Sequence, residues 1–359
     1  MTISLMENNQ TIAQVEGLAA KMLKRGGLRA KRLERSGNAQ VFVLEAGGET
    51  PRHVVKFYFR HPDDPRDRLE TEFAGFSFLW GQGIASIPRP VAVNREESCA
   101  IYEFIEGDKI LPADITTEDI KYAVNFLADL KRLNNTARSS HIAPASDACF
   151  SISAIVAGIE RRLDRLTKIT AKGQEYEELG SFLREDFKPF LGILTQWAKE
   201  QCSQKRIFFD SEVPWEERTL SPSDFGFHNA IRARDGRIVF LDFEYFGWDD
   251  PSKMVVDFLL HPAMTLSESM KKCFARGMLD VFKENKGLID RLRVVYPLHG
   301  LKWCVLLLNE FIPNDFSRRS FAAGNPLDPS QVRRQQLLKA KNFYGKIREI
   351  YEDFPYAIG

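Results

Sequence analysis

The sequence predicts an α+β fold in which a β-rich first part precedes a mainly helical second part. About the first 105 residues hold short β-rich runs separated by turns, and one helical segment interrupts them. From about residue 117 onward, most of the 359-residue chain has helical periodicity. Because strands and helices do not alternate regularly, a doubly wound parallel sheet is not expected. We therefore predict two lobes, residues 1–104 and residues 105–359.

The predicted first lobe begins with a helix over residues 11–24, where Ile12, Val15 and Leu18 recur at helical spacing before a Gly-Gly pair ends it. Runs rich in Val, Phe and Tyr follow, and turns containing Gly and Asn separate them. This pattern predicts an antiparallel meander and two further strands. The predicted strands cover 28–33, 41–44, 54–58, 91–93 and 100–104, and a helix between the third and fourth covers 66–80.

The predicted second lobe is helical apart from a short β-rich insert at about 231–242. One further helix is expected after Pro251. The remaining predicted helices cover 118–133, 152–167, 174–202, 264–284, 297–311 and 330–352.

Charge and cysteine content narrow the function classes. The chain has 50 Lys and Arg against 49 Asp and Glu, so no overall field favours nucleic acid or an anionic membrane. The five cysteines are widely spaced and include no C-x-x-C pair, which favours a reducing cytoplasm over a disulfide framework or a zinc site. The start lacks the regions of a signal peptide, and the most apolar stretch is too short to span a bilayer. We expect a cytoplasmic protein that binds neither nucleic acid nor membrane, and nothing in the sequence indicates its oligomeric state.

Three polar residues at fixed spacing carry the strongest chemical signal. Asp224 precedes Asn229 by five residues, and Asp242 follows after two short apolar runs around an Asp-Gly turn. Phosphoryl transfer needs a carboxylate that orients the acceptor hydroxyl and takes its proton, and oxygen ligands that hold magnesium on the nucleotide phosphates. A hairpin would return the chain to the same edge of such a site. The alternative is that Asp224 and Asn229 only cap a turn and that Asp242 ends a strand.

In this stretch the sequence resembles the aminoglycoside phosphotransferase family, a branch of the protein-kinase-like superfamily. Asp224, Asn229 and Asp242 match the family's motif, and Gly247-Trp248-Asp249-Asp250-Pro251 resembles its G-W-x-D-P run. The resemblance implies a two-lobed fold with a β-rich N-lobe and a mainly helical C-lobe. It also implies that ATP or GTP, with Mg²⁺, phosphorylates a hydroxyl of a small molecule such as a sugar, an amino alcohol or an aminoglycoside. Asp224 would then be the catalytic base, with Asn229 and Asp242 as metal ligands.

The first lobe agrees with this interpretation. Kinase-like folds need a lysine on the third strand and a helical glutamate that positions it. Lys56 lies in the third predicted strand, although an edge strand or a snorkelling side chain would also explain it. Glu70 and Glu72 are both candidate partners on the following helix, and we favour Glu72 because it precedes Leu79 by seven residues, as in the family pattern.

Two other segments of the first lobe receive nucleotide-binding roles from the resemblance. The turn Ser36-Gly37-Asn38 would cover the phosphates, although it is not a complete glycine-rich loop. The run containing Glu103 and Ile105 resembles the hinge whose backbone groups contact the base. Side chains there do not distinguish ATP from GTP.

The sequence departs from the family pattern in two places near Asp224. Pro222 stands where many members have a histidine, and His228 stands where glycine is common. His228 either contacts phosphate or acceptor or lies solvated in a loop. The other five histidines form no close cluster in the sequence, so a histidine metal site is not expected. Asp257 would either bond the backbone of the catalytic loop or face solvent.

Charged and polar residues near the end of the chain bear on the class of acceptor. The last sixty residues carry more Lys and Arg than Asp and Glu, which favours a neutral or anionic acceptor over a polycation, unless these charges form a solvated face. Lys302, Asn309 and Glu310 either line the acceptor pocket or mark the wet end of an apolar helix. The short distance from Asp242 to Asp257 leaves little room for the segment on which protein kinases dock peptides. The competing hypothesis is a non-catalytic nucleotide-binding regulator of the same fold.

Overall fold

The computed structural model describes residues 10–33, 39–48, 51–60, 64, 66–138, 140–317 and 328–356. The predicted turn Ser36-Gly37-Asn38 lies outside these residues. The described chain forms two compact units. The first comprises the described residues within Met1–Asp108, Ile231–Glu244 and Asn314–Leu327, and the second comprises those within Lys109–Ala230, Tyr245–Pro313 and Asp328–Gly359.

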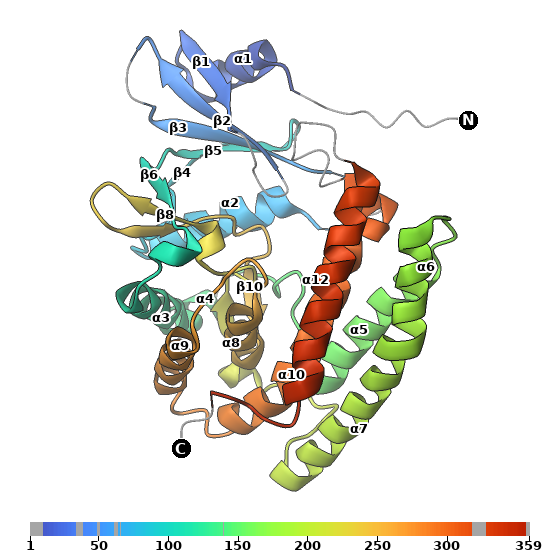
Figure 1. Cartoon of the computed structure of the whole chain (residues 1–359). Helices are drawn as coiled ribbons and strands as arrows, with labels where there is room; N and C mark the ends of the chain where they lie inside the picture. The colour runs from blue at the N-terminus through green and yellow to red at the C-terminus, as the bar shows by residue number, and fades with distance from the viewer. Residues whose placement is uncertain are drawn as a thin grey trace. The chain divides into compact units, whose positions relative to one another are not determined.

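The first unit is built on an antiparallel sheet of five strands, in the order β1-β2-β3-β5-β4 among the described residues (Figure 1). A small sheet in the order β6-β8-β9 lies largely in the same unit. The elements are α1 (Ile12–Leu23), β1 (Leu28–Arg32), β2 (Ala39–Ala46), β3 (His53–Tyr58), α2 (Arg68–Gly81), β4 (Pro90–Asn94), β5 (Cys99–Glu103), β6 (Gly107–Lys109), β8 (Ala230–Ala233) and β9 (Ile238–Phe240).

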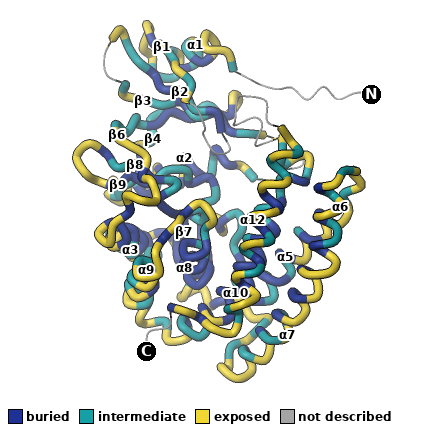
Figure 2. Tube along the Cα trace, in the orientation of Figure 1, coloured by how far each residue is buried: buried dark blue, intermediate teal, exposed yellow. Residues whose placement is uncertain are grey.

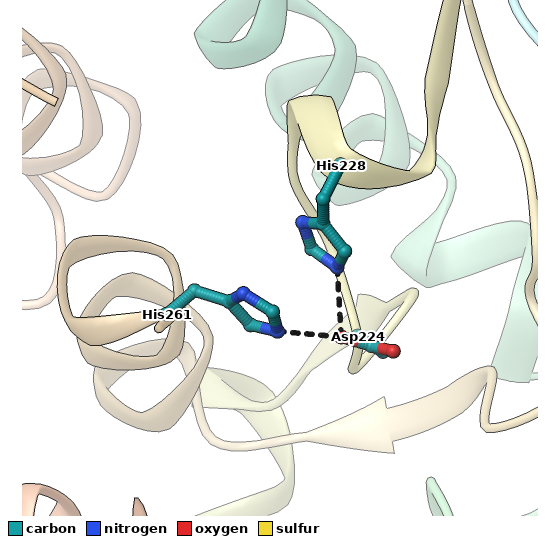
Figure 3. A group of neighbouring side chains, drawn as sticks. All are labelled: Asp224, His228 and His261. Carbon is teal, nitrogen blue, oxygen red and sulfur yellow. Dashed lines mark hydrogen bonds and ion pairs between the residues drawn. The ribbon is translucent and has the colours of Figure 1, made fainter. Parts of the chain in front are cut away.

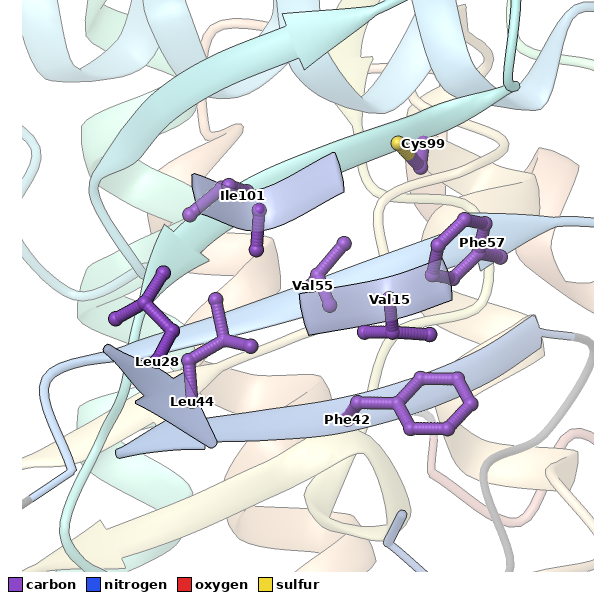
Figure 4. Packing of buried hydrophobic residues seen from close by; sticks show 9 residues of the cluster. Val15, Leu28, Phe42, Leu44, Val55, Phe57, Cys99 and Ile101 are labelled. Carbon is purple, nitrogen blue, oxygen red and sulfur yellow. The ribbon is translucent and has the colours of Figure 1, made fainter. Parts of the chain in front are cut away.

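Helix α1 covers one face of the five-stranded sheet. Val15 of α1 packs in a buried apolar cluster with residues from every second position of the strands, among them Phe42, Val55, Phe57 and Ile101 (Figure 4). Because successive side chains of a strand point to opposite faces, residue 56 must face the other side of the sheet. The alternation of the apolar residues on β3 therefore directs Lys56 away from this core.

Helix α2 supplies a buried glutamate on the side of the sheet to which Lys56 points. Asp67 caps the helix, its side chain accepting a hydrogen bond from the Glu70 amide. Leu69, Glu72, Phe76 and Leu79 recur at spacings of three and four and are all buried. A carboxylate on such an apolar stripe needs partners, since burying an unpaired charge is costly.

The second unit is mainly helical. Its elements are η1 (Pro112–Asp114), α3 (Thr117–Arg132), α4 (Asn134–Arg138), α5 (Ile152–Thr167), α6 (Gln174–Ser181), the π-helical η2 (Phe182–Phe187), α7 (Lys188–Lys205), η3 (Trp215–Glu217), β7 (Thr219–Ser221), η4 (Phe227–Asn229), β10 (Gly247–Asp249), α8 (Pro251–Leu260), α9 (Glu268–Val281), α10 (Leu288–Leu307), η5 (Leu308–Phe311) and α12 (Pro329–Ile350).

Helix α8 lies at the centre of this unit. All of its residues except Asp257 are buried, and Figure 2 shows the helix buried along its length. Strand β10 leads directly into α8, and Asp250 caps it by accepting from the Ser252 amide. The start of the helix is therefore capped, and Asp257 is its one residue that is not fully buried. No helix among the described residues is both long and apolar enough to cross a membrane.

Most predicted elements are present, but two helices differ from the prediction. The segment predicted as one helix over 174–202 is interrupted by the π-helical turn η2. The helix predicted from residue 297 begins nine residues earlier, at Leu288, and holds Pro297 in its interior. A proline favours the first turn of a helix because it lacks an amide proton, and this preference placed the predicted start too late. The mixed α+β fold is as predicted.

Candidate functional site

In the first unit, three carboxylates surround the ammonium group of Lys56. Its Nζ lies 2.6 Å from Glu72 Oε2, 2.5 Å from Asp242 Oδ1 and 3.8 Å from Glu244 Oε1. Burial opposes the charge on Lys56, but these carboxylates outweigh it and hold the pKa of the lysine well above its ordinary value. Lys56 is therefore a fixed cation, and neither an edge-strand position nor a snorkelling side chain explains it.

Glu72 holds Lys56 and the segment after β9 at the same time. Its Oε2 also accepts from the Tyr58 hydroxyl at 2.6 Å, and its Oε1 accepts from the Phe243 amide at 3.0 Å. Glu70, in contrast, pairs with the exposed Arg95 side chain. The two glutamates lie on different faces of α2, and the structure pairs Lys56 with Glu72.

Asp242 has an unusual backbone conformation. Its φ of 66° lies in the left-handed region, which residues with a side chain rarely adopt and which clusters at functional sites. The Phe243 amide is bonded to Glu72, and the Phe243 ring packs edge-on against Phe76 at 5.0 Å. These contacts hold the strained residue so that its carboxylate meets Lys56.

Glu244 adds a third carboxyl group to the cluster around Lys56. It is 1% exposed and pairs with Arg68 at 3.0 Å. Burial and the charge of Asp242 raise the pKa of Glu244 well above its ordinary value. A Mg²⁺ ion at Asp242 would offset negative charge in this cluster, and carboxylate oxygens are the ligands that it prefers. The residues present therefore fit a magnesium ion at this place.

In the second unit, Asp224 and Asn229 lie on the loop between β7 and β8. The side-chain amide Nδ2 of Asn229 donates to the backbone oxygen of Asp224 at 3.1 Å. This bond leaves the Asn229 Oδ1 oxygen, an atom type that can ligate a metal ion, without a partner among the described residues. Before the loop, Ser221 Oγ accepts from the Ser223 amide at 3.0 Å, and Ser223 has a φ of 69°. The loop is thus fixed at both ends.

Two histidines converge on one oxygen of Asp224. The Nε2 atoms of His228 and His261 lie 3.1 Å and 2.9 Å from Asp224 Oδ1 (Figure 3). The two rings are nearly parallel, with centroids 3.8 Å apart. His261 is distant from Asp224 in the sequence but adjacent to it in the fold, and His228 is a partner of Asp224 and not a solvated loop residue.

The hydrogen bonds from the two histidines favour the ionised form of Asp224. His261 Nδ1 accepts from the Ala263 amide at 3.2 Å, so the neutral ring carries its proton on Nε2 and donates it to Asp224. Burial favours the neutral carboxyl, but the hydrogen bonds and charge interactions of the two histidines outweigh it and lower the pKa of Asp224 below its usual range. Asp224 is therefore ionised.

The ligand atoms of Asp224, His228 and His261 lie within 4.8 Å of one another, as the ligands of a metal ion would. Imidazole binds a metal through a lone pair in the plane of its ring, at about 2.0–2.1 Å for zinc. Two rings stacked face to face direct these lone pairs along parallel lines. An ion between them would lie well outside both ring planes, so the arrangement suits two hydrogen bonds to Asp224 and not a metal.

The buried Lys253 contacts the loop that carries Asp224. Lys253 of α8 is 1% exposed, and its Nζ lies 2.6 Å from Asp249 Oδ2, 2.9 Å from Asp257 Oδ2 and 3.5 Å from Ser223 Oγ. Burial opposes its charge, but the two carboxylates hold the pKa of Lys253 well above its ordinary value. Asp257 also contacts His299 at 3.2 Å. Asp257 therefore neither faces solvent nor bonds the catalytic-loop backbone; it reaches the loop through Lys253.

The remaining predicted residues have simpler surroundings. The backbone amide of Glu103 donates to Arg89 O at 2.9 Å, and its side chain accepts from the Arg89 amide at 3.3 Å. Among the described residues, the backbone amide of Ile105 has no hydrogen-bond partner, so it is available to a ligand. Lys302 is buried and donates to Asp147 O at 3.4 Å, so it does not mark the wet end of its helix.

Sequence reasoning missed His261, Lys253, Glu244 and Arg68. His261 ends α8, and nothing in local spacing connects the end of this helix to the loop at Asp224. Glu244 was visible as the acid two residues after Asp242, but a strand-ending acid gives no sign of its burial. A search for charged residues in the apolar helix that follows Pro251 would have singled out Lys253.

The comparisons with known proteins rest on structure alone. No protein-family model matches the sequence, and no curated protein shows significant sequence similarity to it. A choline kinase from Cryptosporidium parvum Iowa II is similar in structure, with a TM-score of 0.60 and 13% identity over 94% of this chain and 97% of that chain. A Plasmodium vivax ethanolamine kinase gives 0.56 and 15% over 89% of this chain and 83% of that chain. The ADP-bound aminoglycoside phosphotransferase APH(2'')-Ib gives 0.56 and 16%, over 96% of this chain and 100% of that chain.

These proteins match nearly the whole chain, and both compact units are included in the match. Their identity to this sequence is low, so the likeness concerns the fold. The chain has the protein-kinase-like fold that choline kinases, ethanolamine kinases and aminoglycoside phosphotransferases share, as the resemblance in its sequence predicted.

Proposed function

We propose that this chain is a phosphotransferase that transfers the γ-phosphoryl group of a nucleoside triphosphate to a hydroxyl group of a small molecule. The observation that carries the proposal is the position of Lys56 between Glu72 and Asp242. A lysine that is fixed by a helical glutamate and lies against a metal-binding aspartate is the arrangement with which kinase-like folds hold nucleotide phosphates. A purely structural ion pair would not need the strained backbone of Asp242.

The roles of the residues follow from their contacts. Lys56, held by Glu72, binds the phosphates, and Asp242 and Asn229 offer oxygen ligands to Mg²⁺, which neutralises charge on the phosphates when bound. Asp224 is ionised and exposes part of its carboxylate, so it can accept the proton of the acceptor hydroxyl. We assign Glu103 and Ile105 to the segment that contacts the base; the backbone amide of Ile105 has no partner among the residues that the structure describes.

The ligands of the similar proteins guide the choice of nucleotide and acceptor. One of the similar structures contains ADP, which favours ATP over GTP as the phosphoryl donor. The similar proteins are named for choline, ethanolamine and aminoglycosides, so the acceptor we propose is an amino alcohol, a sugar or an aminoglycoside-like molecule. These three classes of acceptor share a hydroxyl group, whose proton an aspartate can accept.

The test is transfer of phosphate from γ-labelled ATP or GTP, with magnesium, into a pooled extract of small metabolites. Wild type, Asp224→Asn and Asp235→Asn are compared. Asp235 is an exposed aspartate in a hairpin turn, and among the described residues its side chain pairs with Arg237, so Asp235→Asn is a matched control. We expect a labelled small molecule with wild type and Asp235→Asn, and a loss of about 10²–10⁴-fold with Asp224→Asn.

Two results would contradict the proposal in different ways. Normal transfer by Asp224→Asn would show that Asp224 is not the base. Tight binding of Mg·ATP without transfer to any acceptor in the extract would favour the non-catalytic regulator. Pro222, which replaces the histidine common in the family, is the observation that keeps this second function as an alternative.

A further inference from the structure

The two carboxylate oxygens of Asp224 have different surroundings. Oδ1 accepts hydrogen bonds from both His228 and His261, whereas Oδ2 has no hydrogen-bond partner among the residues that the structure describes. The side chain is 31% exposed, so it is accessible to a ligand. Rotation about the last torsion of an aspartate is otherwise broad. Anchoring one oxygen twice therefore fixes the direction in which the other oxygen points.

His261 is itself held in place by its surroundings. Its Nδ1 accepts from the Ala263 amide, and the Trp303 ring contacts it edge-on at 4.6 Å between centroids. Its ring stacks on that of His228. Its side chain is only 10% exposed. A residue that is fixed on several sides can transmit its position to the carboxylate that it binds.

The segment after α8 contacts the catalytic loop at a second point. Met264 Sδ accepts from the Phe227 amide at 3.3 Å, and a Cβ atom added to Gly226 would lie 2.4 Å from the same sulfur. The Met264 side chain therefore packs directly against the backbone at Gly226. The run from His261 to Met264 contacts both the aspartate and the turn that follows it, so it acts as a support for the loop.

We propose that His261, together with His228, is a positioning residue that holds Asp224 with its Oδ2 presented to the acceptor hydroxyl. The proposal rests on the proposed function, because it assumes that Asp224 is the base. Pro222, two residues before Asp224, has no amide proton and no side-chain donor, so this position cannot supply the contact. His261 supplies it from the end of α8, and His228 from four residues further along the loop.

The first experiment compares His261→Phe with His261→Gln in the transfer assay, with the acceptor identified from the extract. Phenylalanine keeps a flat ring beside His228 and Trp303 but has no donor, whereas the glutamine amide can still donate to Asp224. We expect kcat to fall by about 10- to 100-fold in His261→Phe, as for a small misplacement of a catalytic group. KM for ATP should stay within about threefold, and His261→Gln should restore most of kcat.

His299→Phe is the matched control. His299 is also completely buried and also contacts an aspartate of α8, but this is Asp257 and not Asp224. We expect His299→Phe to lower the thermal midpoint while kcat stays within about threefold of wild type. If His299→Phe lowers kcat as much as His261→Phe, the effect comes from the packing of α8 and the proposal is overturned.

A second measurement does not require an acceptor. In long-range ¹H–¹⁵N spectra of the histidine rings, we expect His228 and His261 to be Nε2–H tautomers with hydrogen-bonded Nε2 protons, and Asp224→Ala to abolish both signatures. Rings that do not respond to Asp224→Ala would overturn the proposed geometry.

The failures of the two proposals can be told apart. If Asp224→Asn transfers phosphate normally, the proposed base is wrong and the positioning role falls with it. If Asp224→Asn is inactive but His261→Phe has the kcat of wild type, the proposed function stands and the positioning role is refuted. Equal losses in His261→Phe and His261→Gln would also refute it, because the donor would then not matter.

Discussion

Replacing Lys253 by methionine should destabilise the protein strongly. The change keeps most of the volume of the side chain and removes the ammonium that lies 2.6 Å from Asp249 and 2.9 Å from Asp257. At an effective dielectric constant of about 20, each contact is an attraction of roughly 6 kcal/mol before the desolvation cost is subtracted. Both aspartates are largely shielded, with side chains 0% and 13% exposed.

The measurable loss is smaller than these attractions because desolvation offsets much of them. Removing one partner of a buried ion pair typically costs about 3–5 kcal/mol, since the other charge is left uncompensated. We expect the free energy of unfolding of Lys253→Met to fall by about that amount in urea denaturation at neutral pH. Lys253→Met/Asp249→Asn should recover part of the loss, because one of the two uncompensated charges is also removed.

The stability lost in Lys253→Met should also depend on pH, and the pKa of Asp249 determines the direction of this dependence. Burial raises the pKa of Asp249 even beside Lys253, and removing the lysine should raise it further. An acid whose pKa is higher in the folded state stabilises the fold below its unfolded pKa and loses this contribution as the pH rises through its folded pKa. The destabilisation by Lys253→Met should therefore be smaller at pH 5 than at pH 8.

Lys121→Met is the control, because Lys121 forms an exposed pair with Glu118 on the surface of α3. Exposed pairs contribute little, so no clear change in the denaturation midpoint is expected. A free energy of unfolding for Lys253→Met that equals that of wild type would refute the reasoning. It would show that water or a rearranged side chain already compensates the two aspartates.

The remaining predictions concern the nucleotide site and the cysteines. Glu72→Gln should weaken binding of Mg·ATP measured by calorimetry, because Lys56 loses a charged partner, whereas Glu70→Gln, which affects only the exposed pair with Arg95, should bind as wild type does. Asp242→Ala should weaken binding of ATP more in the presence of magnesium than in its absence, and equal effects in both conditions would argue against a metal-ligand role. Burial raises the pKa of the Cys99 thiol to about 12 and that of Cys202 to about 11. In the native protein Cys273, which is not buried, should react with a thiol reagent first, and fast reaction of the buried cysteines would contradict the described packing.

The sequence was sufficient to predict the elements of the first unit because their signals are local. Alternating Val and Phe residues identified the strands, and the same alternation directed Lys56 away from the core beneath α1. Helix geometry allowed only one of Glu70 and Glu72 to reach the lysine, because residues two apart lie on different faces, and the spacing of Glu72 to Leu79 in the family pattern favoured Glu72. The helix boundaries at Pro297 and in η2 were missed because proline and π-helical turns were judged by local preference, and packing outweighed it.

The charges of the site were harder to predict than its motif. Asp242 and Glu244 are two residues apart, and the sequence does not show which faces the lysine. In the structure Asp242 keeps 21% of its side chain exposed, whereas Glu244 is 1% exposed and pairs with Arg68. The left-handed backbone at Asp242 turns the chain between them, and this conformation depends on the bond between Glu72 and the Phe243 amide. The motif singled out Asp242, but the different surroundings of the two acids depend on a contact across 171 positions of the chain.

The loop at Asp224 shows why a missing motif residue is weak grounds for calling a site degenerate. What a catalytic carboxylate needs is a donor at a given place in space, and the chain can supply it from any element that passes there. Pro222 removes the local source of such a donor, while His261 brings one from the end of a helix that begins with the Asp250 cap. Because β10, α8 and the loop are tied by Lys253 to Asp249, Asp257 and Ser223, the position of His261 is fixed relative to Asp224. The replacement of one histidine in the sequence is thus compatible with a carboxylate that is held as firmly as catalysis requires.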